Sequence, residues 1–464
     1  MSLAFAMATL AFLAARGRFG IRYYTTASVA VHYLCTSIVV VVLATRCLTI
    51  RRSLKARALA IGAAALARLL LIPIAPSNYD LDSYRIVVQA LERGEIVYRA
   101  THRYNYGPLW SYVLQGVARA SLAVGLSPFH GFLLLTCLGD AAFALLLAAI
   151  LRPSLGKRRA TLAAIFFFAN PIAIALSAYH GQFDQLALGL VIAGFGVASG
   201  AFGRVGRAEG VRPSPLIAGL LVGFGIALKQ IGVLFVPAYL GRKRPLRAFV
   251  RDGALAVVPF LVLLAPFAIS SAPEVEAHVL KYASFSGTWG WYAIARSLAI
   301  PTPPAALASY LALALASFLS FRAARQGHTL LTSSRLAVLV FQALAPGWGV
   351  QTLVWPIAFA PAAAERAFVA VFTLGGTLAY AGMIWRHQTP PTACHIAWLA
   401  ILSWAIYLTW KTRSAAVPAE TKIPTQPPNP NPNPIPNPNP NPNPQAEVGS
   451  NGREGFDGKA EKED

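Results

Sequence analysis

The chain has 464 residues, of which 56% are hydrophobic and only 12% are charged, with a formal net charge of +22. Apolar runs of about 20 residues, the length that crosses a bilayer as a helix, recur along it, which excludes an ordinary soluble domain. The excess Lys and Arg lies in short loops beside these runs, without a basic face interleaved with aromatic residues, and therefore indicates membrane topology and no nucleic-acid partner. The four cysteines lack CxxC spacing, so neither a disulfide framework nor a zinc site is expected.

In chain order, the pattern predicts a hydrophobic extension over residues 1–55, a transmembrane domain over residues 56–410 and a disordered tail over residues 411–464, where a Pro-Asn repeat can form no core. The predicted fold is all-α and polytopic, with about 11–13 transmembrane helices. The expected spans are 27–47, 56–75, 128–151, 158–178, 183–203, 249–270, 303–321, 329–345, 350–365, 366–386 and 394–410.

Basic loops fix the expected orientation of these spans. The Lys and Arg residues within 46–57, 152–159 and 242–251 should face the cytoplasm. This places the polar stretch 78–108, in which four arginines are balanced by four acids, on the opposite side. The orientation of residues 1–26 stays open.

Two apolar segments do not fit a simple count of crossings. A crossing by residues 109–126 would put the next basic loop on the wrong side, so we expect a helix at the membrane surface. Residues 214–240 begin and end beside basic loops and contain Lys229, which favours a re-entrant pair of short helices.

Several motifs occur in an order that resembles a known superfamily. They are "DLDSY" at 80–84, "VYRATHRYNYGPLW" at 97–110, "YHGQFDQLALGL" at 179–190, "ALKQIGVLFVPAYL" at 227–240, "YASFSGTWGW" at 282–291 and "PGWGVQTLVWPIAF" at 346–359. Together they resemble the GT-C superfamily of glycosyltransferases, in particular polyprenol-phosphate-dependent mannosyltransferases of bacteria and archaea and the catalytic subunit of GPI mannosyltransferase I. The resemblance implies a GT-C-type fold with an extracytoplasmic first loop bearing surface helices.

The resemblance also implies a donor and a mechanism. Without nucleotide sugars outside the cell, the donor is a polyprenyl-phosphate hexose, with mannose favoured, and the acceptor is a lipid-linked or surface glycan. Inverting transfer needs a carboxylate to take the acceptor proton and positive charge or hydrogen-bond donors at the departing phosphate. Asp80 matches the family's first-loop acid, so we assign it as the general base. Asp82 is the second catalytic candidate. It points to the same side if this segment is extended, so it could replace Asp80 as the base or share a divalent metal ion with it.

A simpler interpretation of both acids is that they are solvated, pair with Arg85 or cap a helix that starts at Asp82 or Ser83.

The remaining candidate residues are assigned to substrate binding. Lys229 at membrane depth suits a donor phosphate, although snorkelling or pairing with Asp140 would also explain it. The full set of substrate-binding candidates is Arg103, Tyr104, Tyr106, His180, Gln182, Asp184, Lys229 and Gln351.

The sequence therefore predicts an integral membrane hexosyltransferase, in the plasma membrane of a prokaryote or the endoplasmic reticulum of a eukaryote. A secondary transporter would also show an internal lysine and a re-entrant pair, but we find no inverted repeat and a transporter does not need the long polar first loop. A non-catalytic glycan-lipid binding protein that keeps the fold is the third alternative.

Overall fold

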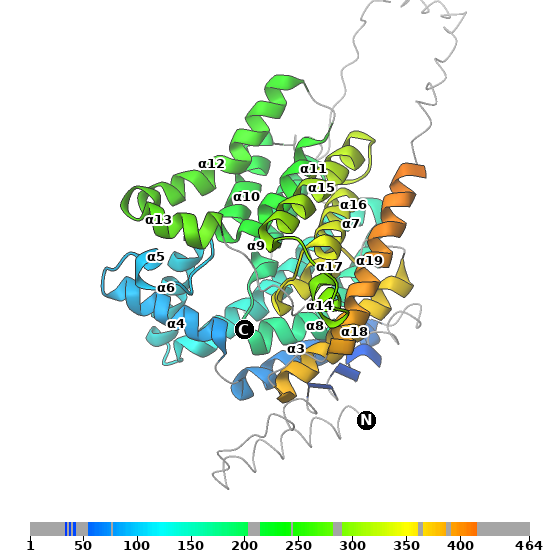
Figure 1. Ribbon diagram of the computed structural model, residues 1–464. Coiled ribbons are helices and arrows are strands. Elements are labelled where there is room, and N and C mark those ends of the chain that lie inside the picture. The colour runs from blue at the N-terminus through cyan, green and yellow to red at the C-terminus, as the bar shows by residue number, and fades with distance from the viewer. Residues whose placement is uncertain are drawn as a thin grey trace, which may run out of the picture. The chain divides into compact units, whose positions relative to one another are not determined.

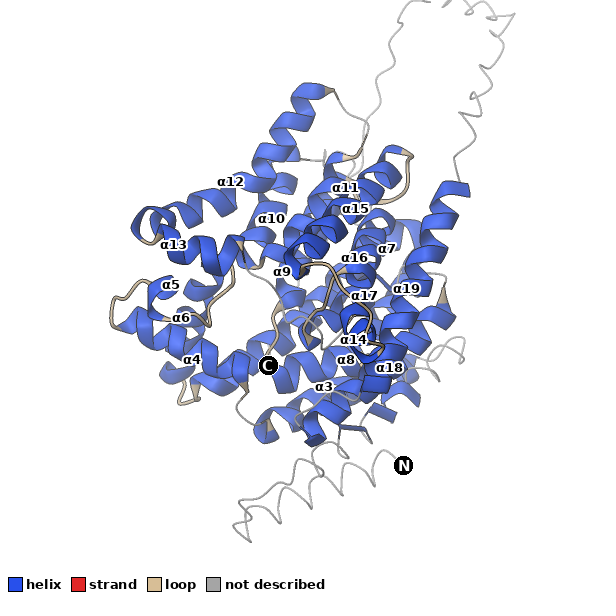
Figure 2. Cartoon of the chain, in the orientation of Figure 1, coloured by secondary structure: helices blue, strands red, loops and turns tan. Residues whose placement is uncertain are grey.

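The computed structural model describes residues 33–34, 37–38, 40–42, 54–75, 78–202, 214–242, 245–281, 290–360, 365–386 and 391–414. These residues form helices and connecting loops without any β-strand (Figure 2), so the predicted all-helical class is confirmed. The α-helices are α3 (Leu54–Leu71), α4 (Tyr79–Glu92), α5 (Val97–Ala100), α6 (Pro108–Ala123), α7 (Pro128–Phe168), α8 (Pro171–Ala175), α9 (Asp184–Ala198), α10 (Pro215–Leu228), α11 (Val236–Leu240), α12 (Leu246–Ser270), α13 (Ala272–Val275), α14 (Trp291–Ser297), α15 (Ala305–Arg325), α16 (Leu330–Leu344), α17 (Val354–Phe359), α18 (Arg366–Arg386) and α19 (Pro391–Ser414).

Five short segments of other helical types connect them. They are the 3₁₀ segments η1 (Ile72–Ile74), η3 (Gln230–Phe235) and η5 (Val350–Leu353), and the π segments η2 (Leu176–His180) and η4 (Glu276–Leu280).

Six of the described helices are long and apolar enough to cross a membrane, and the chain is accordingly a multi-pass integral membrane protein. Other apolar helices, of 10–17 residues, are shorter than a crossing requires. The long helices thus number fewer than the 11–13 expected, because several expected spans are short or broken. The six candidates are Leu54–Ile74, Pro128–Phe168, Leu246–Ser270, Ala305–Arg325, Arg366–Ile384 and Thr392–Ser414.

Helix α7 contains two expected spans, 128–151 and the start of 158–178, in one continuous run. It runs through the basic segment that was expected to be a loop, but Gly156 has φ +75° and ψ 159°, so the run is two helices joined at a kink. Pro153, inside the same run, removes a helical hydrogen-bond donor just before that kink. The two apolar segments therefore remain distinct helices.

The expected span 158–178 is wrong at its C-terminal end, because α7 stops at Phe168. Asn170 starts a new helix there, since its side chain accepts the backbone N–H of Ile172 and Pro171 occupies the first helical position. The expected span is thus split into α7, α8 and the π segment η2, whose end carries part of the site described below.

Helices α4 and α5 of the first polar stretch and the following α6 pack around an aromatic core, and α5 lies beside α13 (Figure 1). Trp110 stacks on Phe183 with ring centroids 3.7 Å apart, and Tyr106 meets the same Phe183 ring edge-on at 5.0 Å. Phe183 directly precedes α9, so this core attaches the first stretch to the start of α9. The expected helix at 109–126 is confirmed as α6, while its place at the membrane surface stays a prediction.

A second attachment joins the first stretch to the break in the 214–240 segment. Lys229 has extended backbone angles (φ −150°, ψ 128°) and separates α10 from η3, so the expected pair of short helices is present. Gln230 donates its side-chain amide to the Asn105 carbonyl at 2.9 Å. A Cβ on Gly107 would lie 2.0 Å from the Ala227 carbonyl oxygen, so only glycine permits this approach of the two backbones.

Some expectations fall outside the described residues. These are most of the span 27–47, residues 282–289 of the "YASFSGTWGW" motif and the tail after Ser414.

Candidate active site

Helix α4 begins earlier than the sequence suggested. It starts at Tyr79, so the start at Asp82 or Ser83 that the simpler interpretation of the acids assumed is wrong. The N-cap is Asn78, whose side-chain oxygen accepts the backbone N–H groups of Asp80 and Leu81, both at 3.1 Å. Asp80 therefore lies in the first helical turn, where the partial positive charge of the helix N-terminus stabilises a carboxylate.

Asn78 also fixes where this helix end points. Its amide nitrogen donates to the carbonyls of Tyr179 and His180, at 3.4 and 3.3 Å. The first turn of α4 is thereby held against the end of η2, a segment about 100 residues further along the chain.

The Asp80 carboxylate accepts hydrogen bonds from three side chains. Its Oδ2 accepts from His180 Nε2 at 2.8 Å and from Gln182 Nε2 at 2.6 Å, and its Oδ1 accepts from the Tyr106 hydroxyl at 3.1 Å. The Asp80 side chain is 17% exposed. A carboxylate offers about four lone-pair positions, so one position on Oδ1 remains for a further donor.

The charge state of Asp80 follows from these neighbours. Burial alone would raise the pKa of its carboxyl, but the hydrogen bond and charge of His180, the charge of Lys229 and the Tyr106 hydrogen bond outweigh burial and lower the pKa. Asp80 is thus ionised at neutral pH and can accept a proton.

His180 is held at both ring nitrogens. Because a carboxylate oxygen only accepts, Nε2 carries the proton that is donated to Asp80. Nδ1 lies 3.2 Å from the hydroxyl of Tyr380 on α18, which donates to this nitrogen when the ring is neutral. Between His180 and Gln182, Gly181 has φ +75°, a left-handed conformation that lets both neighbours turn toward Asp80.

A second charged group adjoins this carboxylate. Lys229 Nζ forms an ion pair with Asp184 Oδ2 at 2.6 Å and lies 3.5 Å from Gln182 Oε1. The other oxygen of Asp184, Oδ1, accepts the indole N–H of Trp355 at 2.6 Å. Gln182 donates to Asp80 and accepts from Lys229, and so connects the two carboxylates. We call the group Asp80, Tyr106, His180, Gln182, Asp184, Lys229, Trp355 and Tyr380 the polar network.

Lys229 does not pair with Asp140, the alternative that its sequence position allowed. Asp140 on α7 instead pairs with Arg68 of α3 at 2.5 Å, and Arg68 also donates to the Phe168 carbonyl at 2.8 Å. Arg68 thus connects α3 to both helices of the α7 run, before and after the kink, and Lys229 is left to the polar network.

The shared metal site expected of Asp80 and Asp82 stays a prediction, but the extended backbone that it assumed is wrong, because both residues lie in the first turn of α4. The expectation required an extended segment, whereas helical geometry turns positions two residues apart by about 200° around the axis. In the part of the chain that the structure describes, no group of three or more His, Cys, Asp or Glu side chains is arranged to hold a metal ion. We therefore derive no step through a metal.

Three other candidates lie outside the polar network. Arg103 stacks on the Tyr79 ring at 3.9 Å and donates to Ser83 Oγ at 3.0 Å, which braces the first turn of α4. Tyr104 is buried in the aromatic core and donates to the Gly107 carbonyl at 2.6 Å. Gln351 is half-buried in η5.

Sequence reasoning missed three residues that complete the geometry. Asn78 carried a usable signal, since Asn before a turn with two acids is a common helix start. Trp355 lies inside the quoted "PGWGVQTLVWPIAF" motif but was not singled out. Tyr380 carries no local signal, because its contact with His180 joins residues 200 positions apart.

Comparison with known protein families identifies a match. The model of glycosyltransferase family 87 matches residues 104–346, just over half of the chain. The matched part contains Tyr106, His180 and Lys229, whereas Asp80 precedes it and Tyr380 follows it. No curated protein matches the chain.

Proposed function

The chain belongs to glycosyltransferase family 87, and on that premise we propose that it moves a hexose from a polyprenyl-phosphate sugar to a lipid-linked or glycan acceptor by inverting displacement. Mannose is the favoured sugar because the first-loop motif "DLDSY" resembles that of mannosyltransferases. The observation that carries the proposal is the ionised carboxylate of Asp80, which is held by three donors and keeps one acceptor position free.

The chemistry assigned to Asp80 is proton transfer. As the acceptor oxygen attacks the anomeric carbon, its O–H proton moves to Oδ1 of Asp80, and the bond between the anomeric carbon and the phosphate oxygen breaks. The electron pair of that bond leaves with the polyprenyl phosphate. His180 and Gln182 both donate to Oδ2, so they fix the carboxylate in place and leave the proton-accepting side of Oδ1 open.

Lys229 is the cation we assign to the departing phosphate. An ammonium has three N–H donors, and the contacts with Asp184 and Gln182 use two of them. The third is available to a phosphate oxygen. Tyr106 and Phe183 rings lie 5.2 and 4.9 Å from Nζ, which holds the ammonium beside Asp80 by cation–π attraction.

The transfer assay tests this function directly. Purified protein is incubated with labelled polyprenyl-phosphate mannose or polyprenyl-phosphate glucose and mixed lipid acceptors, and labelled products are separated from donor. We expect transfer from one donor, mannose first, and none after Asp80→Asn. Absence of transfer from both donors overturns the proposed donor class, and donor uptake into protein-containing vesicles without transfer would indicate a transporter.

A further inference from the structure

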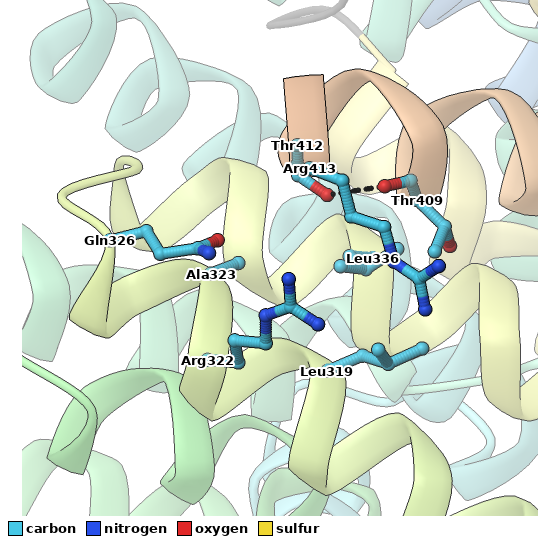
Figure 3. Close-up of a pocket in the computed structure, with 8 residues that line it drawn as sticks. All are labelled: Leu319, Arg322, Ala323, Gln326, Leu336, Thr409, Thr412 and Arg413. Atoms are coloured by element: carbon cyan, nitrogen blue, oxygen red, sulfur yellow. Dashed lines mark hydrogen bonds between the residues drawn. The ribbon is translucent and has the colours of Figure 1, made fainter. Parts of the chain in front are cut away.

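A polar pocket separate from the polar network lies between α15, α16 and α19. Arg322 and Arg413 extend from α15 and α19 toward the same space (Figure 3). The pocket is shallow and opens to solvent. Its lining residues are Leu319, Arg322, Ala323, Gln326, Leu336, Thr409, Thr412 and Arg413, without a carboxylate among them.

The two arginines differ from their basic neighbours. Glu365, at the same end of the helices, pairs with both Arg335 and Lys411, at 3.4 and 2.9 Å. Neither Arg322 nor Arg413 has an acidic partner among the described residues. Two guanidinium groups that face one space without a counter-ion repel each other, and an anion between them removes that cost.

Membrane topology alone does not explain this arrangement. Basic residues at cytoplasmic helix ends satisfy the positive-inside rule wherever they point, and they also complement the negative C-terminus of a helix. The positive-inside rule and the interaction with the helix C-terminus would both be satisfied if the two side chains extended separately into solvent. Convergence on one pocket lined by threonine side chains instead supplies the planar donors that suit a phosphate group.

The surface beside the pocket is apolar. Phe318 and Leu315 precede Arg322 by four and seven positions on α15, and Trp410 precedes Arg413 by three on α19, so each lies on the same helix face as the arginine that follows it. Phe318 is 59% exposed and Trp410 is 63% exposed. An anion site next to exposed apolar surface suits a phosphate that carries acyl chains.

We propose that Arg322 and Arg413 bind the phosphate of an anionic phospholipid in the cytoplasmic leaflet. The phosphate lies between the two guanidinium groups, and the acyl chains lie along the exposed faces of α15 and α19. This lipid site is separate from the polar network and requires nothing of the proposed transfer reaction.

Native mass spectrometry of the full-length protein in detergent tests the lipid site. Dioleoyl phosphatidylglycerol is titrated against wild type, an Arg322→Gln/Arg413→Gln variant and an Arg247→Gln/Arg325→Gln variant. The last removes two exposed arginines that do not line the pocket, and so matches the loss of charge. We expect the apparent affinity to fall about tenfold or more in the pocket variant and to change little in the control. Thermal unfolding of all three proteins verifies folding.

Two further arms identify the ligand. Dioleoyl phosphatidylcholine, which has no net charge, should bind equally to the three proteins, and excess inorganic phosphate should leave bound phosphatidylglycerol in place. Equal losses in the pocket and control variants, or unchanged binding in the pocket variant, overturn the site. Complete displacement by inorganic phosphate overturns the lipid assignment in favour of a soluble phosphate.

Discussion

Asp80 is the residue at which the proposed reaction is most directly tested. Asp80→Asn keeps the side-chain shape but cannot take a proton, so we expect turnover to fall by about 10² to 10⁴-fold. Donor binding should survive. The control is Asp82→Asn, which lies in the same helical turn and changes charge equally, but is about 200° around the helix axis from Asp80. Near-normal turnover of Asp80→Asn in a steady-state transfer assay would remove Asp80 from the base role.

The pH dependence of kcat/KM provides a separate test of the Asp80 environment. Because the pKa of Asp80 is lowered from 3.8, the carboxylate is active above that value, and the acidic limb that it causes lies below pH 3.8. His180→Phe removes a hydrogen bond and charge that lower this pKa while burial still raises it, so the limb should move to higher pH. Tyr380→Phe leaves the hydrogen bond between His180 and Asp80 intact, so it should shift the acidic limb less than His180→Phe does. An unmoved limb in His180→Phe contradicts the assignment.

Lys229 is predicted to support donor binding. Removing Lys229 alone would leave Asp184 buried without its cation, at a cost of about 3–5 kcal/mol, so the informative variant is Lys229→Met/Asp184→Asn, which removes both charges. We expect a higher KM for the polyprenyl-phosphate donor with an unchanged acceptor KM. Lys55→Gln, at an exposed position, is the control. An unchanged donor KM would return the pair to a purely structural role.

At the scale of single residues, the sequence predicted which residue types form the site, but it did not predict where their side chains lie relative to one another. The polar types at 80, 180, 182 and 229 indicated a site because charge and amides at a membrane boundary are costly without a function. The angle between Asp80 and Asp82 depends instead on whether the segment is helical. One capping side chain, Asn78, decides that.

Among the helical elements, the join between the first polar stretch and α10 depends on Gly107. Gly107→Ala places a methyl group 2.0 Å from the Ala227 carbonyl oxygen, which must push the two backbones apart. We expect a loss of about 1–3 kcal/mol in stability and a fall in turnover, since Tyr106 is the preceding residue. Gly116→Ala within α6 meets nothing within 4 Å and should stabilise by up to about 1 kcal/mol. Chemical denaturation and the transfer assay check both, and equal behaviour of the two variants contradicts the close approach.

Most helices were predictable from apolar runs, but their ends followed local chemistry that hydropathy does not contain. The interruption of the expected span 158–178 at Asn170 and Pro171 depends on a cap and a missing N–H. The break at Lys229 was predictable because an uninterrupted apolar helix would have to carry this charge across the bilayer.

For the whole molecule, the predicted topology places the polar network outside and the arginine pocket inside. Single cysteines at Gln89 and Val124, both exposed, should react with an impermeant thiol reagent added from outside, in a background without the four native cysteines. A cysteine at Lys157, in the basic kink of α7, should react only after permeabilisation. Labelling of Val124→Cys only from the cytoplasm would mean that α6 crosses the membrane.

The polar network contains side chains from position 80 to position 380. Its members are therefore translated at different times during synthesis of the chain. At roughly 5–20 residues per second, translation of Tyr380 trails that of Asp80 by about 15–60 seconds. Asp184 lacks its Trp355 donor until residue 355 is translated, and His180 lacks its Tyr380 partner until residue 380 is translated. A nascent chain that stopped at the end of the family match, at residue 346, would hold Asp80, His180 and Lys229 but not the two side chains that brace them. The polar network is therefore complete only once translation has passed Tyr380 in α18, so chains truncated between α16 and α18 should lack the proposed transfer activity.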